Sequence, residues 1–169
     1  MPAIPTTIES TPTTFTPAFT FVPQMSEFDD IWSCCAMISG KTIEQVREIA
    51  VTKLKHPARG PFYYGETHIA ALLAQLEFVG SVYKEISKVS DIPDLALILV
   101  NFHEDMQCGR HILFHRGRAS HTSGTSIEYA IDPSVGCVPA ERIRNNFKNI
   151  AGHWVIGIHS MNIKTGTGK

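Results

Sequence analysis

The spacing of apolar residues changes once along this chain, near Gly80, and this change limits the folds open to it. Before Gly80, apolar residues recur three and four positions apart, which is the period of a helix with one buried face. After Gly80, short apolar runs alternate with clusters of Pro, Gly and Ser, a pattern typical of strands. Helices first and strands afterwards predict an α+β domain, with N-terminal helices packed on a mostly antiparallel sheet.

The ends of the expected helices carry their own signals. Asp29 or Asp30 offers a cap for the first helix, and Gly40 ends it. Thr42 and Gln45 match a capping box at the start of the second helix. We expect helices at 31–39, 42–54, 66–78 and 139–147, and strands at 81–86, 94–102, 110–116, 126–132 and 153–160.

The first 20 residues have a different composition from the rest of the chain. They hold seven Thr, four Pro and a single charged side chain, Glu9. Proline removes backbone hydrogen-bond donors from this segment. The segment also has too little apolar surface to offset the conformational entropy that it would lose on ordering. We expect a disordered tail at 1–20 that is dispensable for folding, one domain at 21–162 and a flexible C-terminus at 163–169.

The charge of the chain argues against two classes of function. With 15 Lys and Arg against 16 Asp and Glu, the formal net charge is -1, so the basic surface required for nucleic-acid binding is missing. No apolar run approaches the roughly 18 residues that span a bilayer. The first basic residue is Lys41, so we expect a cytoplasmic protein, or one secreted without a conventional signal peptide. Four cysteines are too few for a disulfide-rich scaffold, and we expect mostly free thiols.

Four positions are spaced as in a known family. Asp30 stands at the start of an expected helix that contains the sequence Ala-Met, and Gln24 lies six residues before it. His111 lies on an apolar strand, and Asp132 opens an Asp-Pro-x-x-Gly turn. Over about residues 20–160 this pattern resembles the papain-like cysteine peptidases, most closely the bacteriocin-processing C39 group. The resemblance implies a papain-like fold and places the nucleophile at residue 30, where this chain has Asp instead of Cys.

The roles of the other residues follow from the same resemblance. In the family a helix N-terminus and an imidazolium stabilise the thiolate, a carboxylate or amide orients the imidazole, and an upstream Gln donates to the oxyanion. His111, Asp132 and Gln24 match these three roles. We expect Asp30, His111 and Asp132 to converge in one cleft between the first helix and the sheet, with Gln24 at its rim.

The replacement at residue 30 changes the chemistry of the site. A carboxylate beside the His keeps the negative charge of a thiolate, but its attack on an amide would produce a mixed anhydride, a far worse intermediate than a thioester. We therefore expect a pseudo-peptidase that binds a peptide or a partner segment in its cleft, with no cofactor and no metal. A hydrolase or acyl-transfer enzyme that uses Asp30 and His111 as general base remains an alternative, with Asp132 and Gln24 in their family roles. A cysteine peptidase inactivated by substitution at residue 30 is a third possibility.

Each site residue also has a simpler interpretation. Asp30 fits a helix N-cap, Asp132 fits the opening of a turn, and Gln24 by itself fits a surface residue. His111 shares a strand face with His115 and fits a structural histidine.

Two further sites compete with these interpretations. Cys34, one helical turn beyond Asp30, is an alternative nucleophile, whereas Cys35 points away from that face. A zinc site is the other alternative, although its spacing is not that of a common zinc finger. Its ligands would be His103, Cys108, His111 and His115.

Overall fold

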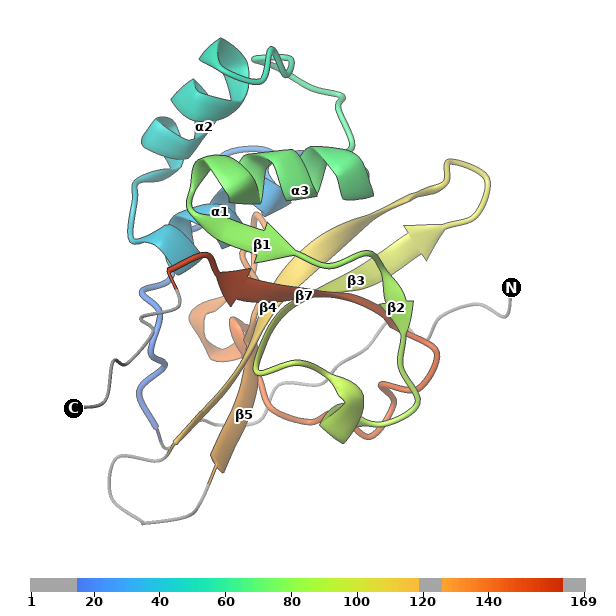
Figure 1. Cartoon of the computed structure of the whole chain (residues 1–169). Helices are drawn as coiled ribbons and strands as arrows, with labels where there is room; N and C mark the ends of the chain where they lie inside the picture. The colour runs from blue at the N-terminus through green and yellow to red at the C-terminus, as the bar shows by residue number, and fades with distance from the viewer. Residues whose placement is uncertain (1–14, 119–125, 163–169) are drawn as a thin grey trace, which may run out of the picture.

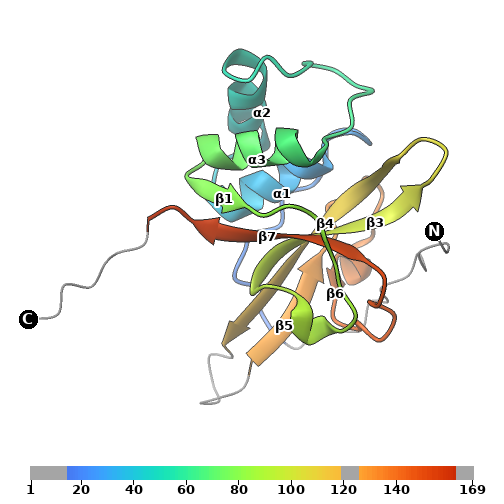
Figure 2. The same ribbon diagram turned by 45° about the vertical axis from the view of Figure 1, so that its right-hand side comes forward.

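The computed structural model describes residues 15–118 and 126–162, and every structural statement below refers to these ranges. Within them, three helices gather at one end of the molecule, and β5 lies at the opposite end (Figures 1 and 2). The helices are α1 Asp30–Ser39, α2 Ile43–Thr52 and α3 Glu66–Gln75. The α+β prediction is confirmed.

The strands of the described residues form one sheet of seven members, and every pairing in it is antiparallel. The order is β1-β7-β3-β4-β5-β6, and β2 also pairs with β7. The strands are β1 Phe78–Gly80, β2 Lys84–Glu85, β3 Leu95–His103, β4 Cys108–Arg118, β5 Ser126–Ile131, β6 Ile143–Arg144 and β7 Trp154–Ser160. Two short 3-10 turns, η1 Val89–Asp91 and η2 Pro139–Glu141, lie between them.

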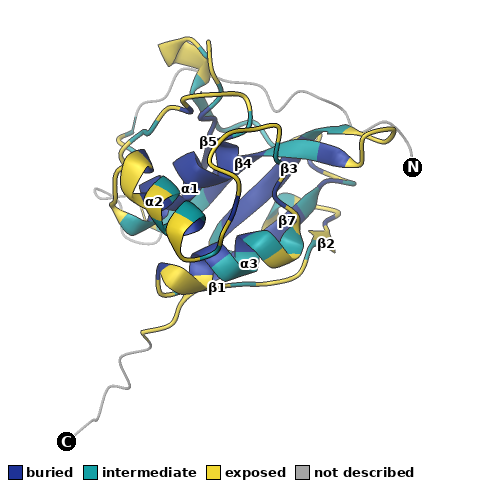
Figure 3. Ribbon diagram, turned by 90° about the horizontal axis from the view of Figure 1, so that it is seen from above, coloured by how far each residue is buried: buried dark blue, intermediate teal, exposed yellow. Residues whose placement is uncertain are grey.

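The two faces of the sheet build two separate cores, because successive side chains of a strand point to opposite faces. Leu97 of β3 and Leu113 of β4 pack under the helices. Their neighbours Ile98 and Ile112 pack on the other face, with Phe114. Figure 3 shows the central strands and α1 in the buried colour, and the outer side of α2 exposed. This alternation decides on which face each functional side chain of β4 lies.

The first helix is the centre of the helical layer. Its residues from Asp30 to Ile38 are all buried, because α1 packs against α2 on one side and β4 on the other. Gly40 ends it in the left-handed conformation, at φ 68°. The predicted capping box of α2 is confirmed, since Thr42 Oγ1 accepts from the Gln45 N–H and the Gln45 side chain accepts from the Thr42 N–H.

Two of the predicted helices differ in the structure. The third helix ends at Gln75 rather than Phe78, because 78–80 pairs with β7 as β1. The predicted helix 139–147 is wrong: only the turn η2 forms, and β6 then pairs with β5. Strand pairing satisfies the backbone of this segment, so tertiary contacts override its local helical pattern.

The N-terminal tail is ordered where the structure describes it. The Phe15 ring lies 5.1 Å from that of Tyr129, and the Phe19 ring lies 4.9 Å from that of His115. The Ala18 N–H donates to the Tyr129 hydroxyl at 2.8 Å. The prediction of a disordered tail is therefore wrong for residues 15–20, while residues 1–14 and 163–169 lie outside the described residues. The missed signal is a period of two, with Phe15, Pro17 and Phe19 inward and the residues between them exposed.

This packing predicts that the tail contributes to stability. The double substitution Phe15→Ala and Phe19→Ala removes two half-buried rings, and we expect it to lower the free energy of unfolding by about 2–4 kcal/mol. Urea denaturation followed by tryptophan fluorescence measures this loss. The matched control, Thr16→Ala with Thr20→Ala, changes exposed side chains of the same segment and should shift the free energy by less than about 0.5 kcal/mol. Equal urea midpoints for the two double variants would contradict the prediction.

Candidate functional site

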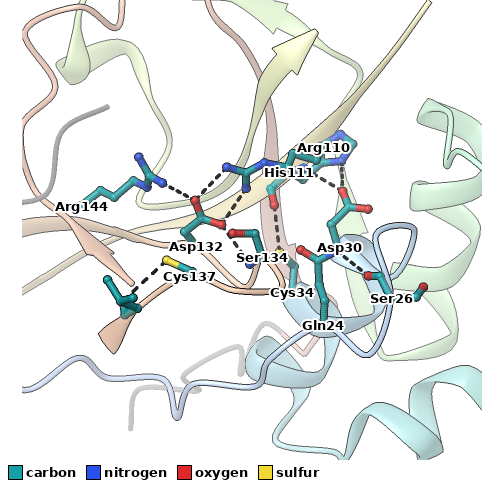
Figure 4. Close-up of polar contacts among 11 residues, drawn as sticks. Gln24, Ser26, Asp30, Cys34, Arg110, His111, Asp132, Ser134, Cys137 and Arg144 are labelled. Atoms are coloured by element: carbon teal, nitrogen blue, oxygen red, sulfur yellow. Dashed lines mark hydrogen bonds and ion pairs between the residues drawn. The ribbon is translucent and has the colours of Figure 1, made fainter. Parts of the chain in front are cut away.

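The N-terminus of α1 is joined to β4 through one carboxylate. Asp30 Oδ2 accepts the backbone N–H of His111 at 2.7 Å and lies 2.7 Å from Nδ1 of the same residue (Figure 4). Both side chains are buried, with 10% of Asp30 and 3% of His111 exposed. The expected contact between Asp30 and His111 is present. It engages the Asp30 carboxylate, the group that a helix N-cap would use to bind the first turn of the helix.

The cap interpretation of Asp30 is therefore wrong. Asp29 occupies the N-cap position, and neither it nor another side chain makes a capping hydrogen bond there. The Asp29 carboxylate instead accepts from the Ser26 hydroxyl at 2.8 Å. Asp30, the first helical residue, directs its carboxylate to the sheet, while the helix dipole still favours a negative charge at this end.

The second nitrogen of the His111 ring is bound by a residue that the sequence did not reveal. Nε2 lies 2.5 Å from the Tyr83 hydroxyl, and the two rings stack at 18°. Burial, and then the charges of Asp30 and Glu66, raise the pKa of Tyr83, so the hydroxyl keeps its proton. Asp30 at Nδ1 and Tyr83 at Nε2 thus give both ring nitrogens of His111 a hydrogen-bond partner.

Tyr83 reaches this position because its backbone is tied to α3. Its N–H donates to Glu66 Oε2 at 2.6 Å, in the short connection between β1 and β2. Both strands pair with β7, which brings this connection beside the helices. No motif or spacing marks Tyr83 in the sequence, so only the pairing of distant strands identifies it.

Gln24 lies in the wall of the cleft, but its side chain is held locally. Its backbone N–H donates to the Pro133 carbonyl at 2.9 Å, and its Nε2 donates to the Ser26 carbonyl at 2.9 Å. Its Oε1 is buried and has no hydrogen-bond partner among the described residues. Gln24 was expected to donate to an oxyanion, but one N–H of its side-chain amide already donates to the Ser26 carbonyl of the same loop.

Asp132 is placed differently from the expectation. Its carboxylate binds Arg110 through two hydrogen bonds, at 2.6 and 2.9 Å, and Arg144 through one at 2.5 Å. It does not orient the His111 imidazole, because both ring nitrogens are bound to Asp30 and Tyr83. Arg110 and His111 are consecutive in β4 and point to opposite faces of the sheet, and Asp132 lies with Arg110. The expected convergence thus holds for Asp30 and His111 and is wrong for Asp132.

The surroundings of Asp132 keep it charged. Burial by itself would raise the pKa of this carboxyl, but the hydrogen bonds and charge of Arg110, the Ser134 N–H and the charge of Arg144 outweigh it and hold the pKa below its usual value. The carboxyl is completely buried, so the cluster is a buried ion network.

The cysteines offer no replacement nucleophile. Cys34 is fully buried, and its thiol donates to the His111 carbonyl at 3.9 Å. Burial, and then the charge of Asp30, raise the pKa of Cys34 well above its ordinary value, and burial raises that of Cys35 to about 12. Neither forms a thiolate at neutral pH, which the alternative of a Cys34 nucleophile requires. All four thiols are free, as expected.

The zinc alternative is also wrong. In the described ranges, no group of three or more His, Cys, Asp or Glu side chains is placed to hold a metal ion. The His111 ring is bound to Asp30 and Tyr83, and His115 Nδ1 lies 2.9 Å from the Tyr129 hydroxyl. Two of the four candidate ligands are therefore bound to other side chains.

A cleft of about 540 Å³ opens at Asp30, between the loop 24–30 and the tip of the β3–β4 hairpin. A smaller pocket of about 140 Å³ reaches His111 and Tyr83, and the two share Tyr63, Cys108 and Gly109. A Cβ on Gly109 would lie 2.8 Å from the Val100 carbonyl oxygen, so the hairpin requires glycine there. The cleft is lined by Gln24, Glu27, Phe28, Asp30, Tyr63, Asn101, His103, Met106, Cys108, Gly109, Arg110, Ser134 and Val135.

The rim of the cleft is apolar. Tyr63, Met106 and Val135 all line it, and each is a large hydrophobic side chain exposed to solvent. The Phe28 ring packs edge-on against Tyr63, with centroids 5.4 Å apart. An exposed apolar rim around a polar floor is typical of a surface that binds another molecule.

Comparison with known proteins places the fold in a class. No protein-family model and no curated protein sequence matches the chain. Among solved structures it is similar to the peptidase domain of Streptococcus ComA, a bi-functional ABC transporter involved in quorum sensing. The two share 12% sequence identity with a TM-score of 0.54, over 83% of this chain and 97% of that domain. The fold is therefore that of a C39-type peptidase domain. Among the described helices, none is long and apolar enough to cross a membrane.

The buried ion network predicts a pH-dependent contribution to stability. Replacing Asp132 with Asn leaves Arg110 and Arg144 without their buried carboxylate, and we expect a loss of about 3–5 kcal/mol at pH 7. Because the folded pKa of Asp132 is lowered, this contribution is complete above the unfolded value of about 4 and is lost as the pH falls through the folded value. Urea midpoints of the two chains between pH 3 and 7 should therefore converge at the acidic end.

The matched control for this prediction is Asp94→Asn. Asp94 pairs with Arg116 at 3.0 Å, but its side chain is 80% exposed, so its loss should cost less than about 1 kcal/mol. If Asp132→Asn destabilised the protein no more than Asp94→Asn, the network would not have the assigned role.

Proposed function

We propose that this domain is a pseudo-peptidase of the C39-like fold, which binds an extended segment of a peptide or protein in its cleft without cleaving it. The observation that carries the proposal is the position of Asp30. Its carboxylate lies on His111 Nδ1 at the N-terminus of α1, where the resemblance places a catalytic thiol. The charge of the site is kept and the sulfur nucleophile is absent.

The surroundings of the pair favour binding over catalysis. The Tyr83 hydroxyl is bound to His111 Nε2, Gln24 donates to its own loop, and Asp132 belongs to a separate ion network. The three residues that match family roles in acyl transfer beside residue 30, namely His111, Gln24 and Asp132, thus have other hydrogen-bond partners. The apolar rim of Tyr63, Met106 and Val135 supplies what an extended segment needs for affinity.

A hydrolase is the second candidate, and the contact between Asp30 and His111 favours it. An aspartate and imidazole at 2.7 Å form a possible general base for water. If this were the function, Gln24→Ala should lower turnover on the order of 10²-fold, because an oxyanion donor would be lost. A binding domain would leave the peptides that it retains uncleaved. Mass spectrometry of the bound peptides therefore distinguishes a binding domain from a hydrolase.

The first test restores the thiol. In Asp30→Cys, a thiol lies at a helix N-terminus beside His111, and both influences lower a thiol pKa below about 8.5. Iodoacetamide should alkylate it faster than the native cysteines at pH 7, and His111→Ala should remove most of the excess. Peptide mapping by mass spectrometry against pH measures each rate.

Met25→Cys is the matched control for the restored thiol. Met25 is an exposed residue of the same loop, so its thiol reports ordinary reactivity. An alkylation profile for Asp30→Cys that equals that of Met25→Cys, and that is unaffected by His111→Ala, would reject the assignment of residue 30 to the nucleophile position.

The second test concerns binding. Random peptides selected on the immobilised chain should lose retention on Met106→Asp with Val135→Asp, which places charges on the apolar rim. The control, Val79→Asp with Met161→Asp, alters exposed apolar residues outside the cleft lining and should retain the same peptides. Equal retention by both double variants, or no selected sequences at all, would overturn the proposed function.

A further inference from the structure

The floor of the cleft carries a carboxylate oxygen that the protein itself does not use. Asp30 Oδ2 accepts both hydrogen bonds from His111, whereas Oδ1 accepts none from any described residue. Oδ1 is not among the buried unpaired atoms, and Asp30 lines the cleft. The free oxygen is therefore reached from the cleft, and it is a strong acceptor for a charged donor.

A second acceptor in the same wall also lacks a donor. Gln24 is 93% buried, lines the cleft, and has no partner for Oε1. Its amide orientation is fixed, because Nε2 must face the Ser26 carbonyl. An unpaired buried carbonyl is unfavourable by about 1–3 kcal/mol, and this one places an uncompensated negative dipole end in the wall of the cleft, which favours a cation nearby.

The remaining charges in the cleft point to the same ligand chemistry. Glu27 adds a carboxylate to the wall that holds Gln24 and Asp30. Arg110, on the opposite wall, directs both terminal nitrogens to Asp132, a carboxylate that it shares with Arg144. Both terminal nitrogens of Arg110 are thus engaged, whereas Asp30 and Glu27 bring two carboxylates to the other wall, so that wall suits a cation better than an anion.

We propose that the segment bound in the cleft carries a primary ammonium group, seated at Asp30 Oδ1 and flanked by apolar side chains. This inference rests on the proposed function. A guanidinium is a planar fork that suits two free carboxylate oxygens, and here only one is free, whereas an ammonium is a compact charge with three donors. A lysine stem passing Phe28 and Tyr63 buries its methylenes against their rings, while an N-terminal amine supplies the same charge without a stem.

The experiment uses pools of hexapeptides with C-terminal amides and with Leu, Val, Phe and Gly mixed at the flanking positions. The third position is Lys, norleucine or Glu, and all pools are N-acetylated except a second norleucine pool, which keeps its free amine. Each pool is passed over the immobilised full chain, and retained peptides are quantified by mass spectrometry. We expect the Lys pool to be retained about tenfold better than the acetylated norleucine pool, and the Glu pool to be retained least.

Substitutions then assign the preference to residues. Asp30→Asn keeps the shape and an acceptor for His111 but removes the charge, and should bring the ratio of Lys to norleucine near one. Gln24→Met, a second variant should Asp30→Asn fold poorly, should lower that ratio severalfold. Glu48→Gln removes an exposed charge on α2, outside the cleft lining, and should leave the ratio unchanged.

The outcomes separate this inference from the proposed function. Retention of the free-amine norleucine pool at the level of the Lys pool would support the ammonium and assign it to a chain N-terminus. Equal retention of all acetylated pools, abolished by Met106→Asp with Val135→Asp, would overturn the ammonium and leave peptide binding intact. Retention that is insensitive to that double variant would overturn both.

Discussion

The hydrogen bonds from His111 to the Asp30 carboxylate are the interaction on which the arrangement of the site depends. They join the first turn of α1 to the middle of the sheet, and they bring the loop 24–30 up to the β3–β4 hairpin, so that a cleft forms between the two. The contact is compatible with both partners, because a helix N-terminus favours a negative charge and a strand N–H needs an acceptor. A carboxylate that satisfies a backbone group and a ring nitrogen together holds the imidazole in a single orientation.

Two charged networks lie on opposite faces of the sheet, although the sequence pattern predicted that their residues share one site. On the helical face, Asp30, His111 and Tyr83 form a short chain of hydrogen bonds beside the cleft. On the other face, Asp132 is enclosed by Arg110 and Arg144 as a buried ion network. The first network leaves Asp30 Oδ1 without a donor among the described residues, whereas the carboxylate of the second is held by two arginines. The cleft and the ion network therefore use different carboxylates, although the residues that bind them are neighbours in β4.

The fold and the chemistry of this domain have to be considered separately. In this chain the fold places a helix N-terminus beside a strand-borne histidine, and that geometry suits any negatively charged group. With sulfur it suits acyl transfer, and with a carboxylate it suits the binding of a cation. The apolar rim of the cleft is compatible with either chemistry, and under the proposed function it would hold an extended segment by its flanking side chains.

The sequence by itself determined the change from helices to strands near Gly80, the end of α1 and the start of α2, and the contact of Asp30 with His111. These features depend on local periodicity, caps and a family spacing that short segments carry. The tertiary structure alone decided the partners of Asp132, the role of Tyr83, the strand β6 in place of a helix, and the packing of residues 15–20. Each of these depends on which face of a strand a side chain takes, or on pairing between segments far apart in the chain. A one-residue change of register would move every side chain to the other face, so these contacts are set only when the sheet is assembled.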